Sequence, residues 1–517
     1  MNKRGSGRAP SWYVLFGLGL LATGCVTGCV VGPSYKKPSV EIPATFKEQA
    51  TPADAAAGAT FRPAQPQDGA VRGKWWEVFG DPQLSALEEQ VAVSNQSLAQ
   101  AEAQFRGARA LVREARAGLF PTVTAGAGVT RSRASAGARS SAAAAAASSG
   151  VTATVYQVPI DLSWEVDLWG RIRRTIEENV ANAQASAADV ENLRLSLQAE
   201  LALDYFQLHG LDEQAELLGR SVTDYQTALK VTTNRHDQGV VSGVDVAEAE
   251  TQLEQTRAQA IDLGVSRTQL EHAIAILTGK APADLTIPAA PITVAPPAIP
   301  AVLPGDLLER RPDIAGAERR MAAANAQIGV ATAAYYPTLS LSGSAGFQSS
   351  TLGKIFSLPN RFWSIGPSLL ETVFDAGRRR AVTEQARAAY DANVAAYRET
   401  VLTAFQGVED NLAAIRILAA ESTQQTAATA AAERSLALAR NRYNGGITTQ
   451  LEVVTAENIA LANERTAVDL KTRQMTASVN LVKALGGNWS TTELPGAGAL
   501  VLGAAVGPGD SAGKPRP

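Results

Sequence analysis

The chain repeats itself at a fixed distance, and this repeat limits what it can fold into. Four features recur 207 positions further on: Gly170 at Gly377, Asn234-Arg235 at Asn441-Arg442, Gly239 at Gly446, and Glu250 at Glu457. Four matches at one offset indicate an internal duplication, so both halves should share one order of elements. Phe120-Pro121 and its counterpart Tyr336-Pro337 are 216 positions apart, so the first half carries nine additional residues before Gly170.

Each half contains a pair of segments with strand-like alternation. In the first half these are 122–130 and 151–166, and the Ser-, Ala- and Gly-rich sequence between them predicts a loop. The alternation changes parity near Pro159, which predicts a bulge or a barrel rim at that point. The second half repeats the pattern at 338–347 and 363–373.

An unusually long helix follows each hairpin. No proline occurs from 160 to 281, and the apolar residues of 208–229 recur at spacings of three and four, which is a heptad seam. A helix over about 171–235 would be roughly 100 Å long at 1.5 Å per residue. The glycines of 239–243 end it, and a shorter helix is expected to run to Thr278.

A shorter helix precedes each hairpin. Asp81-Pro82 suits the N-cap and first position of a helix that should end near Gly118. In the second half, Asp306 to Glu309 has a capping-box pattern for a helix that should reach Tyr336. A second long helix, the turn Gly445-Gly446 and a last helix complete the repeat.

The N-terminus has the features of a bacterial lipoprotein signal. Basic residues precede a short apolar stretch, and small residues precede each of the two cysteines, Cys25 and Cys29. We predict that Cys29 bears the lipid, with Cys25 as the alternative lipid site. A plain secreted protein, with the two cysteines free or joined by a disulfide, is the alternative to lipidation. Several acyl chains, at about 0.8 kcal/mol per buried CH2, would anchor the chain durably in lipid.

These features divide the chain into six segments. We expect a signal peptide at 1–28, an extended lipid-anchored segment at 29–74, a first repeat at 75–280, a Pro-rich linker at 281–304, a second repeat at 305–489 and a disordered tail at 490–517.

Composition and spacing argue against several functions. With 47 Lys+Arg against 50 Asp+Glu, the net charge is -3, which gives no electrostatic footprint for nucleic acid. The three histidines have no partners at ligand spacing, so we expect no metal site. The strand glycines are not followed by a Gly-Lys-Ser/Thr motif, and no nucleophile–base signature stands out. We therefore predict no cofactor and no enzymatic activity.

The strands suggest how the chain meets a membrane. No internal run approaches the roughly 20 apolar residues of a spanning helix, whereas strands of about ten residues suffice when tilted. Four strands cannot close a barrel, and an open edge in lipid leaves costly unpaired backbone groups. Three chains would supply twelve strands and a lumen, whereas two would supply eight, which side chains nearly fill. We predict an α+β membrane protein with a trimeric transmembrane β-barrel and a long α-helical coiled-coil barrel; a soluble β-layer is the alternative.

Several motifs together resemble one family. They are Cys29 to Pro38 (CVVGPSYKKP), Trp75-Trp76 with Phe79 and Asp81, Asp167 to Arg171 (DLWGR), Glu309 to Ile314 (ERRPDI) and Lys483 to Trp489 (KALGGNW). Residues 29 to 489 thereby resemble the outer membrane efflux protein (TolC-like) family, in its lipoprotein branch that serves RND-type efflux pumps. The placement of Cys29 just before Val-Val-Gly-Pro favours it over Cys25.

The resemblance implies a passive homotrimeric duct. It would sit in the outer membrane with a helical tunnel in the periplasm, and would dock on a periplasmic adaptor and an inner-membrane RND-type pump. Two rival functions stay open: the duct of a type I protein secretion system driven by an ABC exporter, and a structural coiled-coil lipoprotein without a pore.

The resemblance also implies site residues. Gly239 and Gly446 match the tip turns that contact the adaptor, and Tyr443 and Glu452 match the periplasmic gate. The family's second acidic gate position is Thr455 here, so Asp245, the first-half counterpart of Glu452, is a further gate candidate. A ring of such carboxylates would attract cations and repel anions. A solvated carboxylate at a helix start is the simpler interpretation of each.

Overall fold

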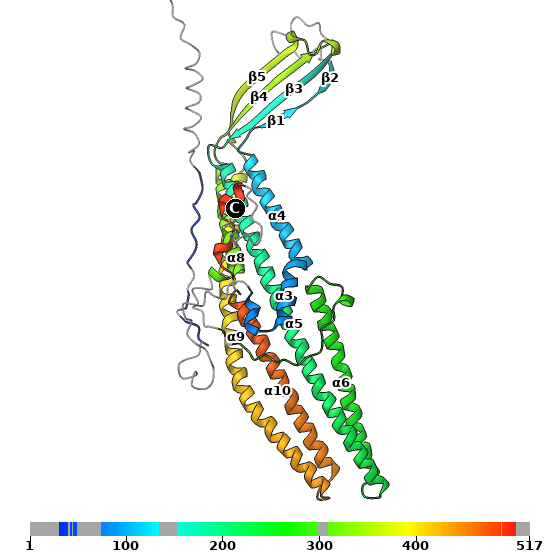
Figure 1. Cartoon of the computed structure of the whole chain (residues 1–517). Helices are drawn as coiled ribbons and strands as arrows, with labels where there is room; N and C mark the ends of the chain where they lie inside the picture. The colour runs from blue at the N-terminus through cyan, green and yellow to red at the C-terminus, as the bar shows by residue number, and fades with distance from the viewer. Residues whose placement is uncertain are drawn as a thin grey trace, which may run out of the picture.

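The protein is an elongated molecule with a sheet at one end and two helical hairpins at the other (Figure 1). The computed structural model describes residues 30–39, 42–43, 45–48, 74–133, 152–297, 299, 309–487 and 489–502. The predicted signal peptide with Cys25, the predicted lipid-bearing residue Cys29, most of the loop at 131–150 and the last residues of the tail therefore lie outside the described residues.

The long helices of the two halves have identical lengths. Helices α5 (Arg171–Asp237) and α9 (Arg378–Asn444) each have 67 residues, and α6 (Gly243–Leu277) and α10 (Gln450–Ala484) each have 35. Both pairs of boundaries are separated by the 207 positions seen in the sequence. Helix α5 packs on α6 and α9 on α10, and α5 also touches α10, so the two hairpins lie side by side (Figure 1).

Glycine makes the reversal at the tip of each hairpin. Gly239 and Gly446 have φ of 72° and 71°, in the left-handed region that other residues rarely adopt. No atom lies within 4 Å of a Cβ built at either position, so the backbone conformation alone requires glycine there. The two tip turns expected from the sequence are therefore present at the predicted residues.

The sheet is antiparallel and joins the two halves. Its strands are β1 (Thr122–Ala125), β2 (Gly128–Arg133), β3 (Thr152–Val166), β4 (Thr338–Ser349) and β5 (Arg361–Leu370). β3 and β4, from different halves, pair at the centre; β5 lies beyond β4, and both β1 and β2 lie along the other side of β3. Since β1 and β2 continue one another, the sheet has four strand positions, as the sequence predicts.

The predicted bulge near Pro159 is absent from these strands. Ala125 pairs with Ile160 and Gly128 with Gln157, so the register is the same on both sides of the interruption. Proline has no N–H to donate, which interrupts the ladder without an inserted residue. The Pro159 carbonyl still accepts from Gly126 N at 3.0 Å. The prediction of a bulge was therefore wrong.

The helix expected before the first hairpin is divided in two. Helix α3 spans Pro82–Ser94 and α4 spans Gln96–Ala117. The predicted cap is confirmed, because Asp81 Oδ1 accepts from the backbone of the first turn. The predicted continuity is wrong, because Asn95 accepts from Leu98 N and donates to the carbonyl of Leu277 on α6. A residue that caps one helix in this way must leave the preceding one.

Two further segments differ from expectation. Glu309 and Arg310 are helical, Arg311 interrupts the helix, and α8 then spans Pro312–Ala333, whereas the predicted start at Asp306 lies outside the described residues. The sequence predicts a disordered tail from residue 490. Residues 490–502 instead include α11 (Ala497–Leu502), which packs on α4 and α5. Leu500 is buried against Val112, and Arg116 donates to the Val501 carbonyl at 2.7 Å. That prediction was wrong for 490–502.

The Pro-rich linker is held to the first half by a buried polar network. Asp212 on α5 accepts from Arg267 Nε at 2.6 Å and from the backbone N of Ala290 at 3.1 Å. Arg267 also donates to the carbonyl of Ile287, and His209 Nδ1 lies 2.8 Å from the Ala290 carbonyl. The main apolar core lies beside this network, where α3, α5, α6 and α10 converge.

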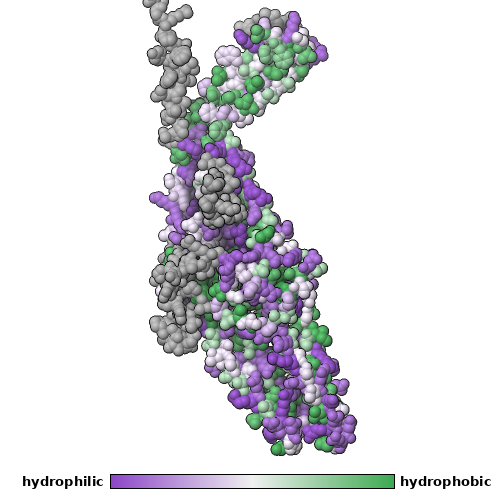
Figure 2. Space-filling model, viewed as in Figure 1, coloured by the Kyte–Doolittle hydropathy of each residue, from purple (hydrophilic) through white to green (hydrophobic). Residues whose placement is uncertain are grey.

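Helices throughout the described part of the chain are too polar or too short to span a bilayer. Figure 2 shows hydrophobic residues over the sheet and a mainly hydrophilic surface over the long helices. The sheet and the residues just after it carry these exposed large apolar side chains: Val123, Val129, Ile160, Trp363, Ile365, Leu369, Leu370, Val373 and Phe374.

Candidate functional site

The tip of the second hairpin carries two of the predicted gate residues. Glu452 lies in the first turn of α10, and its Oε1 accepts from Arg442 Nη1, in the last turn of α9, at 2.7 Å. Its Oε2 accepts from the hydroxyl of Thr448 in the intervening turn. Both oxygens of the Glu452 carboxylate thus accept hydrogen bonds that connect the end of α9, the turn and the start of α10.

Tyr443 is buried between helices, with 8% of its surface exposed. Its ring packs against Val453 and neighbouring alanines of the same hairpin, and the guanidinium carbon of Arg235 lies 4.6 Å from its centroid. The Tyr443 hydroxyl has no hydrogen-bond partner among the described residues. Tyr443 therefore connects the two hairpins through its ring. In the sequence, Arg235 is distinguished only by its place in the repeat, opposite Arg442.

Asp245, the third gate candidate, bonds within its own turn. Its Oδ2 accepts from the backbone N and the hydroxyl of Ser242, each at 2.8 Å, and forms a capping box at the start of α6. Tyr443 and Glu452 thus share one tip, while Asp245 lies in the first hairpin. The structure gives Asp245 the helix-capping role that was its simpler interpretation.

Exposed apolar side chains flank both tip glycines. They repeat at the offset of the duplication, with Val240 corresponding to Ile447 and Val244 to Leu451. Isolated exposed apolar residues are common on protein surfaces, but matched pairs beside two exposed turns give each tip a small apolar surface.

A second polar contact joins the hairpins above the tips. Glu457 is 4% exposed, and its Oε1 accepts from Arg440 Nη2 at 3.0 Å. The same nitrogen lies 3.4 Å from Asp224 Oδ2 on α5. Burial raises the pKa of Glu457 although Arg440 opposes the shift. In the sequence, Glu457 is distinguished only as the counterpart of Glu250 in the repeat, because its pairing with Arg440 depends on how the helices pack.

The segment that follows Cys29 is fixed at the junction of sheet and helices. Val31 N donates to the carbonyl of Trp169 at 3.1 Å, and Arg174 donates to the carbonyls of Val31 and Gly32. Val30 lies against Gly170, at the start of α5. Cys29 itself lies outside the described residues, but its neighbour is placed beside the sheet.

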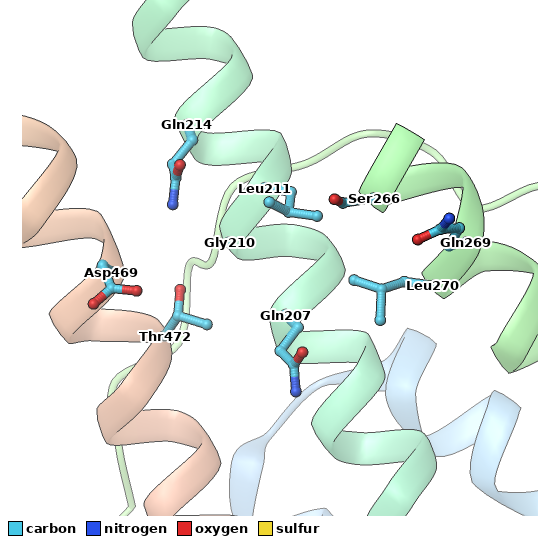
Figure 3. Close-up of a pocket in the computed structure, with 9 residues that line it drawn as sticks. All are labelled: Gln207, Gly210, Leu211, Gln214, Ser266, Gln269, Leu270, Asp469 and Thr472. Atoms are coloured by element: carbon cyan, nitrogen blue, oxygen red, sulfur yellow. The ribbon is translucent and has the colours of Figure 1, made fainter. Parts of the chain in front are cut away.

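Two grooves in the helical part contain no catalytic arrangement among the described residues. Figure 3 shows the larger one, of about 430 Å³, between α5, α6 and α10; amide and hydroxyl side chains predominate, and Asp469 is the one ionisable group among its nine lining residues. In the smaller groove, Asp81 accepts from the Tyr205 hydroxyl at 2.8 Å and so serves as a structural acceptor. No cluster of three metal-ligating side chains occurs in the described ranges.

Comparison with known proteins agrees with this architecture. Residues 87–280 and 303–487 match the family model described as outer membrane efflux protein. The chain is 31% identical to the probable efflux pump outer membrane protein TtgC of Pseudomonas putida KT2440, over 89% of this chain and 93% of that protein. It is 32% identical to the outer membrane protein OprJ of Pseudomonas aeruginosa PAO1, over 92% and 96%.

A solved structure extends the similarity to the fold. The outer-membrane channel OprN superposes with a TM-score of 0.80 at 32% identity, over 89% of this chain and 100% of that one. The family match covers both halves, and the four strand positions and paired long helices are shared with a channel. The chain therefore belongs to the outer membrane efflux protein family.

Proposed function

We propose that this protein is the outer-membrane channel of a tripartite efflux system, a passive trimeric duct and not an enzyme. The observation that carries the proposal is the pairing of a four-position strand sheet with two equal helical hairpins in one family member. The sheet would lie in the outer membrane, and the hairpins would form a tunnel in the periplasm. An inner-membrane pump would supply the energy.

The edges of the sheet support a trimer. Within the described strands, β1 with β2 forms one edge and β5 forms the other. In lipid, both edges would leave backbone groups unpaired unless neighbouring copies pair with them. Three copies supply twelve strand positions and a lumen, whereas two supply eight and leave little space.

The helical part supports the same assembly. Helices α5 and α10 touch, so α6 and α9 flank them on either side. These flanking helices carry the exposed apolar residues Ile261, Val265 and Ile276 on α6, and Ile417 and Leu438 on α9. Contact between α6 of one copy and α9 of the next would bury both sets, which favours association.

The tips would be the working end of the duct. We assign Tyr443 and Glu452 to the periplasmic gate, with Asp245 as a capping residue that lies nearby in the first hairpin. Gly239 and Gly446, with their exposed apolar neighbours, would contact a periplasmic adaptor that links the duct to an RND-type pump. Support comes from the placement of all five residues at the ends of the two hairpins.

Lipidation at Cys29 would anchor the duct. The contacts that fix Val30 and Val31 beside Trp169 and Gly170 support this site, because they keep the residue after Cys29 next to the sheet. Replacing Cys29 with alanine should abolish incorporation of radiolabelled palmitate. Retained label would instead point to Cys25.

Conductance tests the proposed function. The purified protein should migrate as a trimer in native mass spectrometry and conduct ions in planar bilayers once the gate is open. A folded trimer that carries no current, even with gate substitutions, would favour the structural lipoprotein. Association with an ABC exporter in place of an RND-type pump would favour the secretion duct. The relatives are named as efflux pump proteins, which supports efflux over protein secretion.

A further inference from the structure

The carboxylate of Glu452 does not stand alone at the tip. Arg442 Nη1 lies 2.7 Å from Glu452 Oε1, and the hydroxyl of Thr448 bonds to the other carboxylate oxygen. The three residues come from the end of α9, the turn and the start of α10. A positive charge is thereby fixed beside the one acidic side chain in the first turn of α10.

This pairing is not a simple result of the duplication. The first half has an arginine and a carboxylate at the equivalent positions, Arg235 and Asp245. There the arginine lies over the ring of Tyr443, and the carboxylate caps Ser242. The second hairpin therefore has an arrangement of its own.

The pair contributes little to stability, so its main effect is on charge. The side chains of Arg442 and Glu452 are 53% and 43% exposed, and ion pairs this exposed to solvent add little to stability. Opposite charges at 2.7 Å form a dipole with no net charge, whose potential falls faster with distance than that of a single charge. One helical turn further on, Thr455 offers no second carboxylate.

We infer that Arg442 determines the ion selectivity of the periplasmic opening by neutralising Glu452. The inference rests on the proposed function, in which the second tips of three copies surround the opening. Three neutral pairs would give an opening with weak preference between cations and anions, and anionic cargo would not be repelled. Three unpaired carboxylates would instead concentrate cations there.

Reversal potentials in planar bilayers test the inference. The permeability ratio of potassium to chloride is measured across a KCl gradient for the wild type, Arg442→Gln, Glu452→Gln and the double variant. We expect Arg442→Gln to raise the ratio about threefold or more, because clustered charges produce potentials of one kT or more at an opening. Glu452→Gln should lower it by a similar factor, and the double variant should return near the wild type.

Salt and a distant arginine provide the controls. The shifts should shrink from 0.1 M to 1 M KCl, because the Debye length falls from about 10 Å to about 3 Å. Arg398→Gln removes an exposed charge from the same helix, about 65 Å from the tip at 1.5 Å per residue, and should leave the ratio unchanged. Conducting Arg442→Gln channels with the wild-type ratio would overturn the inference. Absence of current in every variant would instead contradict the proposed function.

Discussion

The guanidinium carbon of Arg235 lies 4.6 Å from the ring centroid of Tyr443, and this contact joins α5 of the first hairpin to α9 of the second. Separation of the two hairpins at their tips would break it. A cation–π contact contributes about 0.5–2 kcal/mol, so its loss should favour the open state roughly two- to thirtyfold. Arg235→Ala and Tyr443→Leu should each increase the fraction of time that single channels conduct.

Tyr443→Phe is the matched control for that prediction. The hydroxyl of Tyr443 has no partner among the described residues, whereas its ring makes the contact with Arg235. The phenylalanine variant should therefore gate like the wild type. If it opens as often as Tyr443→Leu, the ring contact does not hold the tips together.

Glu88 should make the stability of the protein depend on pH. Its side chain is fully buried in α3, both carboxylate oxygens lack partners among the described residues, and burial raises its pKa well above the usual value. A carboxyl group whose pKa is higher in the folded than in the unfolded state makes the folded state less stable as the pH rises. Below the unfolded-state pKa the group is protonated in both states and this loss of stability is absent. Glu88→Leu should raise the melting temperature by more at pH 8 than at pH 5, measured by circular dichroism. The exposed neighbour Glu89, changed to Gln, should show no comparable gain; equal effects at both pH values would contradict burial of an ionisable Glu88.

Arg440 should matter more for stability than its exposed partner does. Arg440→Leu leaves the carboxylate of Glu457 buried without its cation, which should cost about 2–4 kcal/mol, less than a fully buried pair because Arg440 is 41% exposed. Asp224→Asn should cost under about 1 kcal/mol, since Asp224 is 59% exposed. Chemical denaturation measures both. Without Arg440 the already raised pKa of Glu457 should rise further, so Arg440→Leu should lower the free energy of unfolding by less at pH 5 than at pH 8. A larger loss of unfolding free energy at pH 5 would contradict this account.

The apolar tip residues should affect pump assembly without affecting conduction. Ile447→Ser and Val240→Ser remove exposed apolar surface beside the tip glycines, each worth roughly 1–2 kcal/mol of burial in a complex. Cells carrying both substitutions should lose efflux of the compounds that the wild-type protein exports, while purified trimers keep their conductance. Val93→Ser, at an exposed apolar site on α3, controls for general loss of surface hydrophobicity. Normal efflux by the double variant would place adaptor contact elsewhere.

Features set by local periodicity were predictable from the sequence, and features set by packing were not. The long helix beginning at Arg171 was predictable because a heptad pattern without proline leaves few alternatives. The break at Asn95 was not, because apolar periodicity continues through it and the cap depends on Leu277. Docking of Leu500 was hidden in a Gly- and Ala-rich tail that has little periodicity of its own.

In the candidate site too, the positions of the residues were predictable from the sequence and their contacts were not. The tip glycines and the positions of Tyr443 and Glu452 follow from the repeat and the family resemblance. The partners of those residues do not, because Arg235 and Arg442 occupy equivalent positions in the sequence and yet contact different groups. Only the packing of one hairpin on the other separates their roles.

The equal lengths of α5 and α9 also restrict how the chain can change during evolution. A single residue inserted in one of them would displace its tip by about 1.5 Å and rotate everything beyond it by about 100°. The two tips would then no longer end level, unless the other half gained a residue at the matching position. Insertions and deletions should therefore be rare in these helices or occur in compensating pairs. The nine-residue difference between the halves falls before Gly170, in the stretch that holds the hairpin loop, where length can vary freely.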